Sequence, residues 1–167
     1  TTGESFFEKA DKKISKGKYD KAISKAKKNQ KIIDKKLNQN PIYKAWIMIY
    51  EAQARQIKGE YLEMQTQLIE ANKILASEQS VSPDAYLIAK CRIADIQIAL
   101  GNYLETQKQL EELHNFTETQ PIMDDFLNAE VAHRQIQVLY HLGFLNKTLT
   151  KLPGLTETWQ TLANADT

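Results

Sequence analysis

Two pairs of side chains have the spacing that metal-binding helices use. Glu111 with His114, and Glu130 with His133, each stand three residues apart, so the members of a pair share one helix face. Bundles that bind two iron ions use two such pairs together with two further glutamates. Here the pairs are only 19 residues apart on adjacent predicted helices, so we expect them at different heights. We therefore predict no metal, no other cofactor and no enzyme activity.

The other residues with reactive side chains also form no recognised catalytic or metal-binding motif. The sequence contains no nucleophile elbow, phosphate-binding glycine loop, zinc-protease helix or paired cysteine motif. The single cysteine, Cys91, lies in an apolar stretch and is predicted to be a core residue. His133 and His141, eight residues apart, have the spacing of a pH switch, but we favour ordinary surface or groove positions for them.

A basic helix face is the remaining candidate for ligand binding. Lys21, Lys25 and Lys28 share one face and could meet phosphates. Acidic residues, Asp20 and Asp34, are interleaved with them, and no aromatic residues that could stack on bases accompany them. The sequence therefore does not favour nucleic acid as a partner.

The elements that carry these residues recur with a fixed period. A Gly-x-Tyr sequence begins at Gly17, Gly59 and Gly101, and a decayed copy begins at Gly143, so each step is 42 residues. A constant period of this size is typical of stacked repeats, in which each unit buries its apolar face against its neighbours. The chain is thus predicted to be all-α, with about four helical hairpins that break at these glycines.

Capping signals and apolar spacing give the bounds of the predicted helices. Asn40-Pro41 and Ser82-Pro83 each place a capping side chain before a proline at the first helical position. The predicted helices span residues 4–15, 19–38, 41–58, 60–77, 83–100 and 102–115, then a seventh from within 121–125 to before Gly143. A short eighth helix is predicted to stop at Pro153-Gly154, and residues 156–167 are predicted to form a C-terminal capping helix and tail after a repeat array of residues 1–155.

Equivalent positions in the repeats support the same register. Seven residues before the glycines stand Ala10, Ala52, Ala94 and Ile136, mostly small, as close helix packing requires. Nine residues after them stand Ala26, Leu68, Leu110 and Leu152, and twelve after them Asn29, Ala71, Leu113 and Leu155. We predict that all three columns are buried.

This pattern resembles the tetratricopeptide repeat. A helix that ends in Gly-x-Tyr, an Ala seven residues earlier and apolar residues nine and twelve later are similar to that repeat, whose usual length is about 34 residues. The 42-residue step resembles the longer-helix variety of kinesin light chains and of peptide-sensing regulators in Gram-positive bacteria. The resemblance covers about residues 4–152 and implies a right-handed α-solenoid closed by a capping helix. It implies a non-catalytic protein- or peptide-binding scaffold.

In that family, residues six and nine before the glycine face a concave groove. The resemblance therefore assigns Asp11, Gln53, Asp95 and Gln137 to one groove column, and Glu8, Tyr50, Arg92 and Arg134 to the other. Trp46 and Tyr140 are predicted to add an apolar anchor for the partner. The alternative is a sensory or regulatory segment of a larger signalling protein, in which ligand binding changes the curvature of the solenoid.

Charge is distributed unevenly along the chain. Residues 1–58 carry a net charge of +9 and residues 59–167 carry −8, so self-association through oppositely charged ends is a third hypothesis. No apolar run reaches the ~20 residues of a membrane helix, which predicts a soluble domain with no membrane segment, and slightly favours the cytoplasm. The first residue is Thr1 and not Met, so we expect a processed or excised chain.

Overall fold

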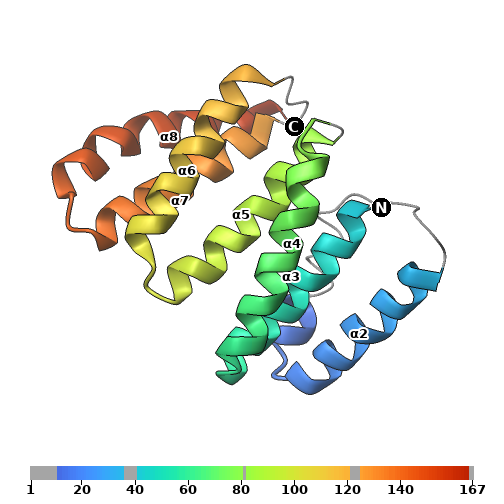
Figure 1. Ribbon diagram of the computed structural model, residues 1–167. Helices are drawn as coiled ribbons and strands as arrows, with labels where there is room; N and C mark the ends of the chain where they lie inside the picture. The colour runs from blue at the N-terminus through green and yellow to red at the C-terminus, as the bar shows by residue number, and fades with distance from the viewer. Residues whose placement is uncertain (1–10, 36–40, 81, 121–124, 166–167) are drawn as a thin grey trace. The chain divides into compact units, whose positions relative to one another are not determined.

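All regular secondary structure in the described part of the protein is helical. The computed structural model describes residues 11–35, 41–80, 82–120 and 125–165 (Figure 1). Residues 11–14 are helical, and seven helices follow: α2 (Tyr19–Lys35), α3 (Pro41–Lys58), α4 (Tyr61–Glu78), α5 (Pro83–Ala99), α6 (Tyr103–Thr119), α7 (Asp125–His141) and α8 (Leu145–Ala165). The predicted all-α class is confirmed. None of these helices is both long and apolar enough to cross a membrane.

The four predicted glycine turns have the same backbone geometry. Gly17, Gly59, Gly101 and Gly143 have φ values of 65°, 77°, 78° and 77°, in the left-handed region that side chains with a Cβ avoid. Each glycine N–H donates to the carbonyl three residues back, and the next N–H donates to the carbonyl five residues back. This is the Schellman motif, which satisfies the last carbonyls of a helix.

The following helix begins in the same way each time. The carbonyl of the residue after each glycine accepts a hydrogen bond from the residue four positions on, at distances of 2.9 to 3.1 Å. Those donor residues, Ala22, Met64, Thr106 and Thr148, are all buried. The 42-residue period is therefore present in the backbone as well as in the sequence.

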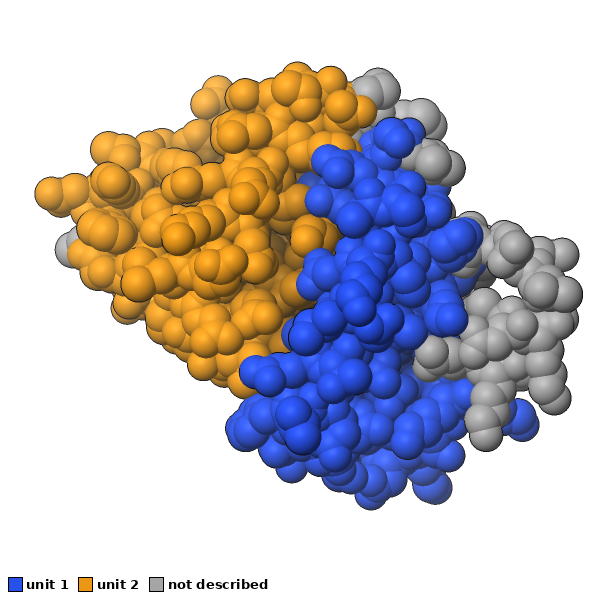
Figure 2. Space-filling model, in the orientation of Figure 1, with its two compact units in different colours: residues 1–89 blue, residues 90–167 orange. Residues whose placement is uncertain are grey.

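The chain divides into two compact units, residues 1–89 and 90–167, and α5 runs from one into the other (Figure 2). In the first unit, α3 packs against both α2 and α4. One core cluster there joins Ile14 to α2 and α3, through Ala22, Ile23, Ala26, Ile47, Tyr50 and Ala54. In the second unit, α7 packs against both α6 and α8.

The predicted core columns are buried in the middle repeats, whereas their members in the last repeat are more exposed. Ala52, Ala94, Leu68 and Leu110 are at most 4% exposed. Ala71 and Leu113 are likewise buried, whereas Ile136 and Leu155 are half-buried and Leu152 is 39% exposed. The prediction that Leu152 is core is wrong. Ala10 and Glu8 lie outside the described residues, as does the predicted helix start near residue 4.

Two helix ends differ from the prediction. Helix α6 runs to Thr119 instead of about Asn115, because the side chain of Phe116 is buried and anchors one more turn. The predicted stop at Pro153-Gly154 is wrong, because α8 continues through Pro153 to Ala165. Residues 156–165 are thus the second half of α8, not a separate helix. A proline there removes one backbone donor but can be tolerated with bending.

Candidate functional site

The residues predicted to line one groove instead contact each other between repeats. Arg134 on α7 forms two hydrogen bonds with Asp95 on α5, Nε to Oδ1 at 2.7 Å and Nη2 to Oδ2 at 2.9 Å. Its Nη1 also binds Glu130 one turn earlier on α7. Burial by itself lowers the pKa of Arg134, but the bidentate pairing with Asp95 and the second carboxylate together outweigh it, so the pKa is raised. Arg134 is 8% exposed, so its guanidinium is committed to this network.

In the first unit, Tyr50 and Asp11 occupy the corresponding positions. Tyr50 lies 39 residues after Asp11, just as Arg134 lies 39 residues after Asp95. Burial, and then the charge of Asp11, raises the pKa of Tyr50. In the second unit, the position nine before a glycine therefore binds the position six before the preceding glycine and joins successive hairpins. In the first unit, the corresponding Asp11 is near enough for its charge to affect Tyr50.

The remaining predicted site residues differ widely in how much of each side chain is exposed to solvent. Trp46 is 3% exposed and donates from Nε1 to the carbonyl of Ala85 at 3.3 Å, and Tyr50 belongs to the core cluster of the first unit. Trp46 is therefore not accessible as the apolar anchor that was predicted, and Tyr50 is not accessible as a groove-lining residue. Gln53, Arg92, Asp95 and Gln137 are half-buried. Only Tyr140, at 64% exposed, presents most of its side chain to solvent, with its ring edge-to-face on His141.

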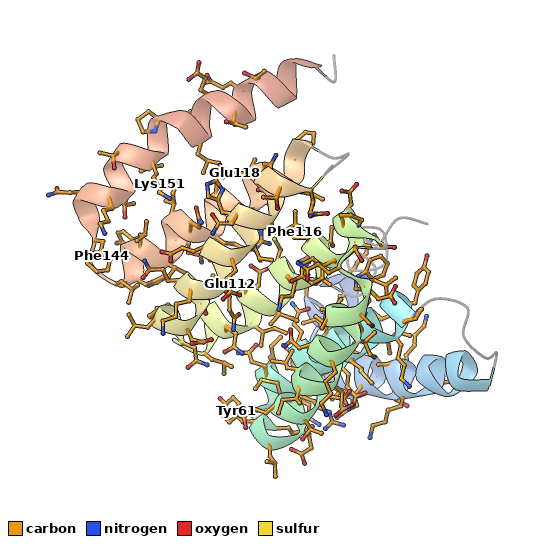
Figure 3. The ribbon with its side chains drawn as sticks, turned by 45° about the horizontal axis from the view of Figure 1, so that its top comes forward. Tyr61, Glu112, Phe116, Glu118, Phe144 and Lys151 are labelled. Atoms are coloured by element: carbon orange, nitrogen blue, oxygen red, sulfur yellow. The ribbon has the colours of Figure 1, made fainter. Side chains whose placement is uncertain are left out.

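A groove that was not predicted from the sequence lies between α6 and α8, and residues of α7 form its floor. Its volume is about 570 Å³, within the range of roughly 300–1,000 Å³ typical of ligand sites. It is lined by His114, Thr117 and Glu118 of α6, by Asn128, Ala129, Ala132, Gln135 and Ile136 of α7, and by Thr150, Lys151, Gly154, Leu155 and Thr158 of α8. Figure 3 shows Glu118 on α6 and Lys151 on α8, the helices that form its two walls.

A smaller hollow of about 190 Å³ continues the groove toward the Gly143 turn. Gln135 and Lys151 line both hollows, and Glu111 and Lys147 line only the smaller one. Gln135 spans the groove between them: its Nε2 donates to the carbonyl of Leu110 at 3.1 Å, and its Oε1 accepts from Lys151 at 3.2 Å. The amide therefore links α6, α7 and α8 and fixes their spacing.

The two walls of the groove carry opposite charges. The α6 wall has Glu111, which accepts from Gln107 at 3.1 Å, and Glu118, which lies 3.6 Å from His114. The α8 wall has Lys147 and Lys151, and Lys147 lies 5.1 Å from the ring centre of Phe144. The charges along the groove balance, so neither a polyanion nor a polycation is favoured as its ligand.

A change in one core column accompanies the groove. The position seven before the glycine is Ala in the two preceding repeats, where it is at most 1% exposed, and Ile136 in the last. Small residues at this position allow two helices to approach closely, whereas a branched side chain holds them apart. Ile136 lines the groove, so the departure from Ala was the sequence signal for it.

The Glu-x-x-His pairs are not brought together. Glu111 and His114 are on the α6 side of the groove, whereas Glu130 binds Arg134. Arg134 lies two residues after Ala132 of the groove, and residues two positions apart point to nearly opposite sides of a helix. Across the ranges that the structure describes, no group of three or more His, Cys, Asp or Glu could hold a metal ion.

Cys91 is buried, as predicted, and burial raises its pKa to about 12. Such a thiol is protonated near neutral pH and is a poor nucleophile.

Comparison of the chain with models of protein families, with curated proteins and with solved structures gave no match.

Proposed function

We propose that the chain is a non-catalytic module that binds a segment of another protein in the groove between α6 and α8. The observation that carries this proposal is a hollow of about 570 Å³ with an apolar floor, polar walls and opposed charges. Apolar surface at Ala132, Ile136 and Leu155 provides binding energy, while the charged walls provide specificity. This places the proposed site on a different side of α7 from Arg134 and the predicted groove columns.

The proposal includes a repeat architecture that resembles the tetratricopeptide repeat. Four turns with the same hydrogen bonds and a 42-residue spacing support it. The 39-residue offset between Asp95 and Arg134 supports it further, because it places equivalent helices of successive hairpins side by side. A scaffold of this kind presents side chains from several helices and needs no reactive group.

The experiment is to select peptides from a displayed library on the intact chain and to measure their affinity for a groove-blocked variant. Ala132→Trp places a large ring on the floor of the groove, where Ala132 is half-buried. Ala76→Trp is the matched control, because Ala76 is exposed on α4 in the other unit. We expect Ala132→Trp to weaken the selected peptides at least tenfold and Ala76→Trp to leave them unchanged.

Helical circular dichroism of both variants checks that each remains folded. Selection that enriches no peptide, or peptides that bind the folded Ala132→Trp variant with unchanged affinity, would overturn the proposal.

A further inference from the structure

The geometry points to an amphipathic helix as the occupant of the groove, and to the two charged walls as the feature that sets its direction. This inference rests on the proposed binding function and names the kind of partner. The partner helix has an apolar stripe with basic residues along one flank and acidic residues along the other. The basic flank faces α6 and the acidic flank faces α8.

The walls present their charges at helical spacing. Glu111 and Glu118 are seven residues apart on α6, or about 10.5 Å along the axis. Lys147 and Lys151 are one turn apart on α8. In the described part of the chain no ion pair joins the two walls: Glu118 faces His114, and Lys151 donates to Gln135. Neither row of charge neutralises the other, although Lys151 is shared with the Gln135 amide that spans the groove.

The floor fits a helical stripe. Ala129, Ala132 and Ile136 follow one another at intervals of three and four residues on α7. Ala129 is only 2% exposed, so Ala132 and Ile136, together with Leu155 of α8, supply the accessible apolar surface. Apolar side chains at the same intervals on a docked helix would lie along this line. An extended strand is disfavoured, because the groove is lined by residues of three helices whose backbone groups bond within each helix, and it offers no sheet edge.

Opposite charge on the two walls distinguishes the two directions of such a helix. When a helix is turned end over end with its apolar stripe kept on the floor, its two flanks exchange sides. In one direction basic residues meet Glu111 and Glu118, and in the other they meet Lys147 and Lys151. Like charges placed together are unfavourable, so one direction is preferred.

The test uses two synthetic helical peptides with the same leucine stripe and the same composition. One has lysines on the first flank and glutamates on the second, and the other has these flanks exchanged. Each carries a spin label at its N-terminus, and the amide signals of Lys147 and Thr158, which lie toward opposite ends of the groove, report where the label sits. We expect the two peptides to abolish different signals, one that of Lys147 and the other that of Thr158.

A charge-reversed chain provides the control. With Glu111→Lys, Glu118→Lys, Lys147→Glu and Lys151→Glu combined, each peptide should abolish the other signal, while a peptide with glutamine on both flanks weakens the two signals equally in either chain. Peptides that occupy the groove without a preferred end, or keep the same end after reversal, overturn the directional inference and leave the proposed function standing. If neither peptide binds while library peptides do, the helical occupant is wrong. If the library also yields nothing, the proposed function itself fails.

Discussion

Each unit contains an arginine held by two carboxylates, but the two networks join different parts of the fold. In the first unit, Arg55 binds Glu51 one turn earlier on α3 and also Glu60, whose carbonyl starts α4. In the second unit, Arg134 binds Glu130 on its own helix and Asp95 on α5. The first network therefore closes one hairpin across its turn, whereas the second joins neighbouring hairpins.

The two networks also differ in access to water. The side chain of Glu51 is 1% exposed, whereas those of Asp95 and Glu130 are 36% and 41% exposed. A charge that loses its partner costs most where water cannot replace it. A regular backbone repeat can thus carry an electrostatic pattern that does not repeat.

The largest expected effect is on Arg55. Arg55→Ala leaves the Glu51 carboxylate buried without its cation, so we expect the free energy of unfolding to fall by about 3–5 kcal/mol. Arg134→Ala should cost less, about 2 kcal/mol, because its two carboxylates reach water. Urea unfolding followed by circular dichroism measures both values. The combined Glu51→Leu and Arg55→Met variant should recover most of the lost free energy of unfolding, because it removes the unpaired charge. A larger loss for Arg134→Ala than for Arg55→Ala would contradict this ranking of the two networks.

Labelling of Cys91 tests whether the networks act separately. Cys91 is buried in the second unit, close enough to Arg134, Asp95 and Glu130 for their charges to affect its pKa. Arg134→Ala should accelerate its reaction with a disulfide reagent at pH 8 about tenfold for each 1.4 kcal/mol lost from the local opening free energy. Since each unit is compact by itself, Arg55→Ala should change the rate less than twofold.

Equal acceleration by the two variants would show instead that the units open together. The raised pKa adds a pH dependence: the folded thiol keeps its proton to about pH 12, and the unfolded thiol loses it above about pH 9. Stability should therefore fall as the pH rises through that interval, and Cys91→Ala should remove this contribution.

The smallest effects concern the feature that the units share. Gly59→Ala and Gly101→Ala should each cost about 1–2 kcal/mol, because their φ values are nearly equal and positive. An added Cβ meets no atom within 4 Å at either position, so the cost is conformational. Gly154→Ala is the matched control in the interior of α8, where alanine should stabilise the chain by about 0.5–1 kcal/mol. Thermal unfolding that showed unequal costs at the two turns would indicate different turn environments.

The turns and most helix bounds were predictable from the sequence, because glycine, proline and apolar spacing act locally. The mutual binding of the two groove columns was not, since the period gives the register of each repeat but not the 39-residue offset at which Asp95 meets Arg134. The burial of Trp46 was missed for the same reason: its indole partner, the Ala85 carbonyl, is 39 residues away.

The candidate groove shows a different limit. Glu111 and His114 were recognised as a pair, but Gly154, Leu155 and Thr158 of the α8 wall lie beyond the stop that was predicted at Pro153. The local cost of proline inside a helix, about 3 kcal/mol, favoured that stop. Helix α8 packs against α7, and a rule that considers only neighbouring residues cannot weigh such tertiary contacts against this cost.

The glycine turns carry a consequence for how the chain can change in length. Each turn is closed by bonds between residues at most five positions apart, so it requires nothing from the rest of the molecule. A segment that runs from one of these glycines to the next, if inserted at another glycine turn, would therefore bring a complete turn at each of its ends. Gain or loss of a whole hairpin is possible at these points without redesigning a junction, whereas an insertion inside a helix would interrupt its backbone hydrogen bonds.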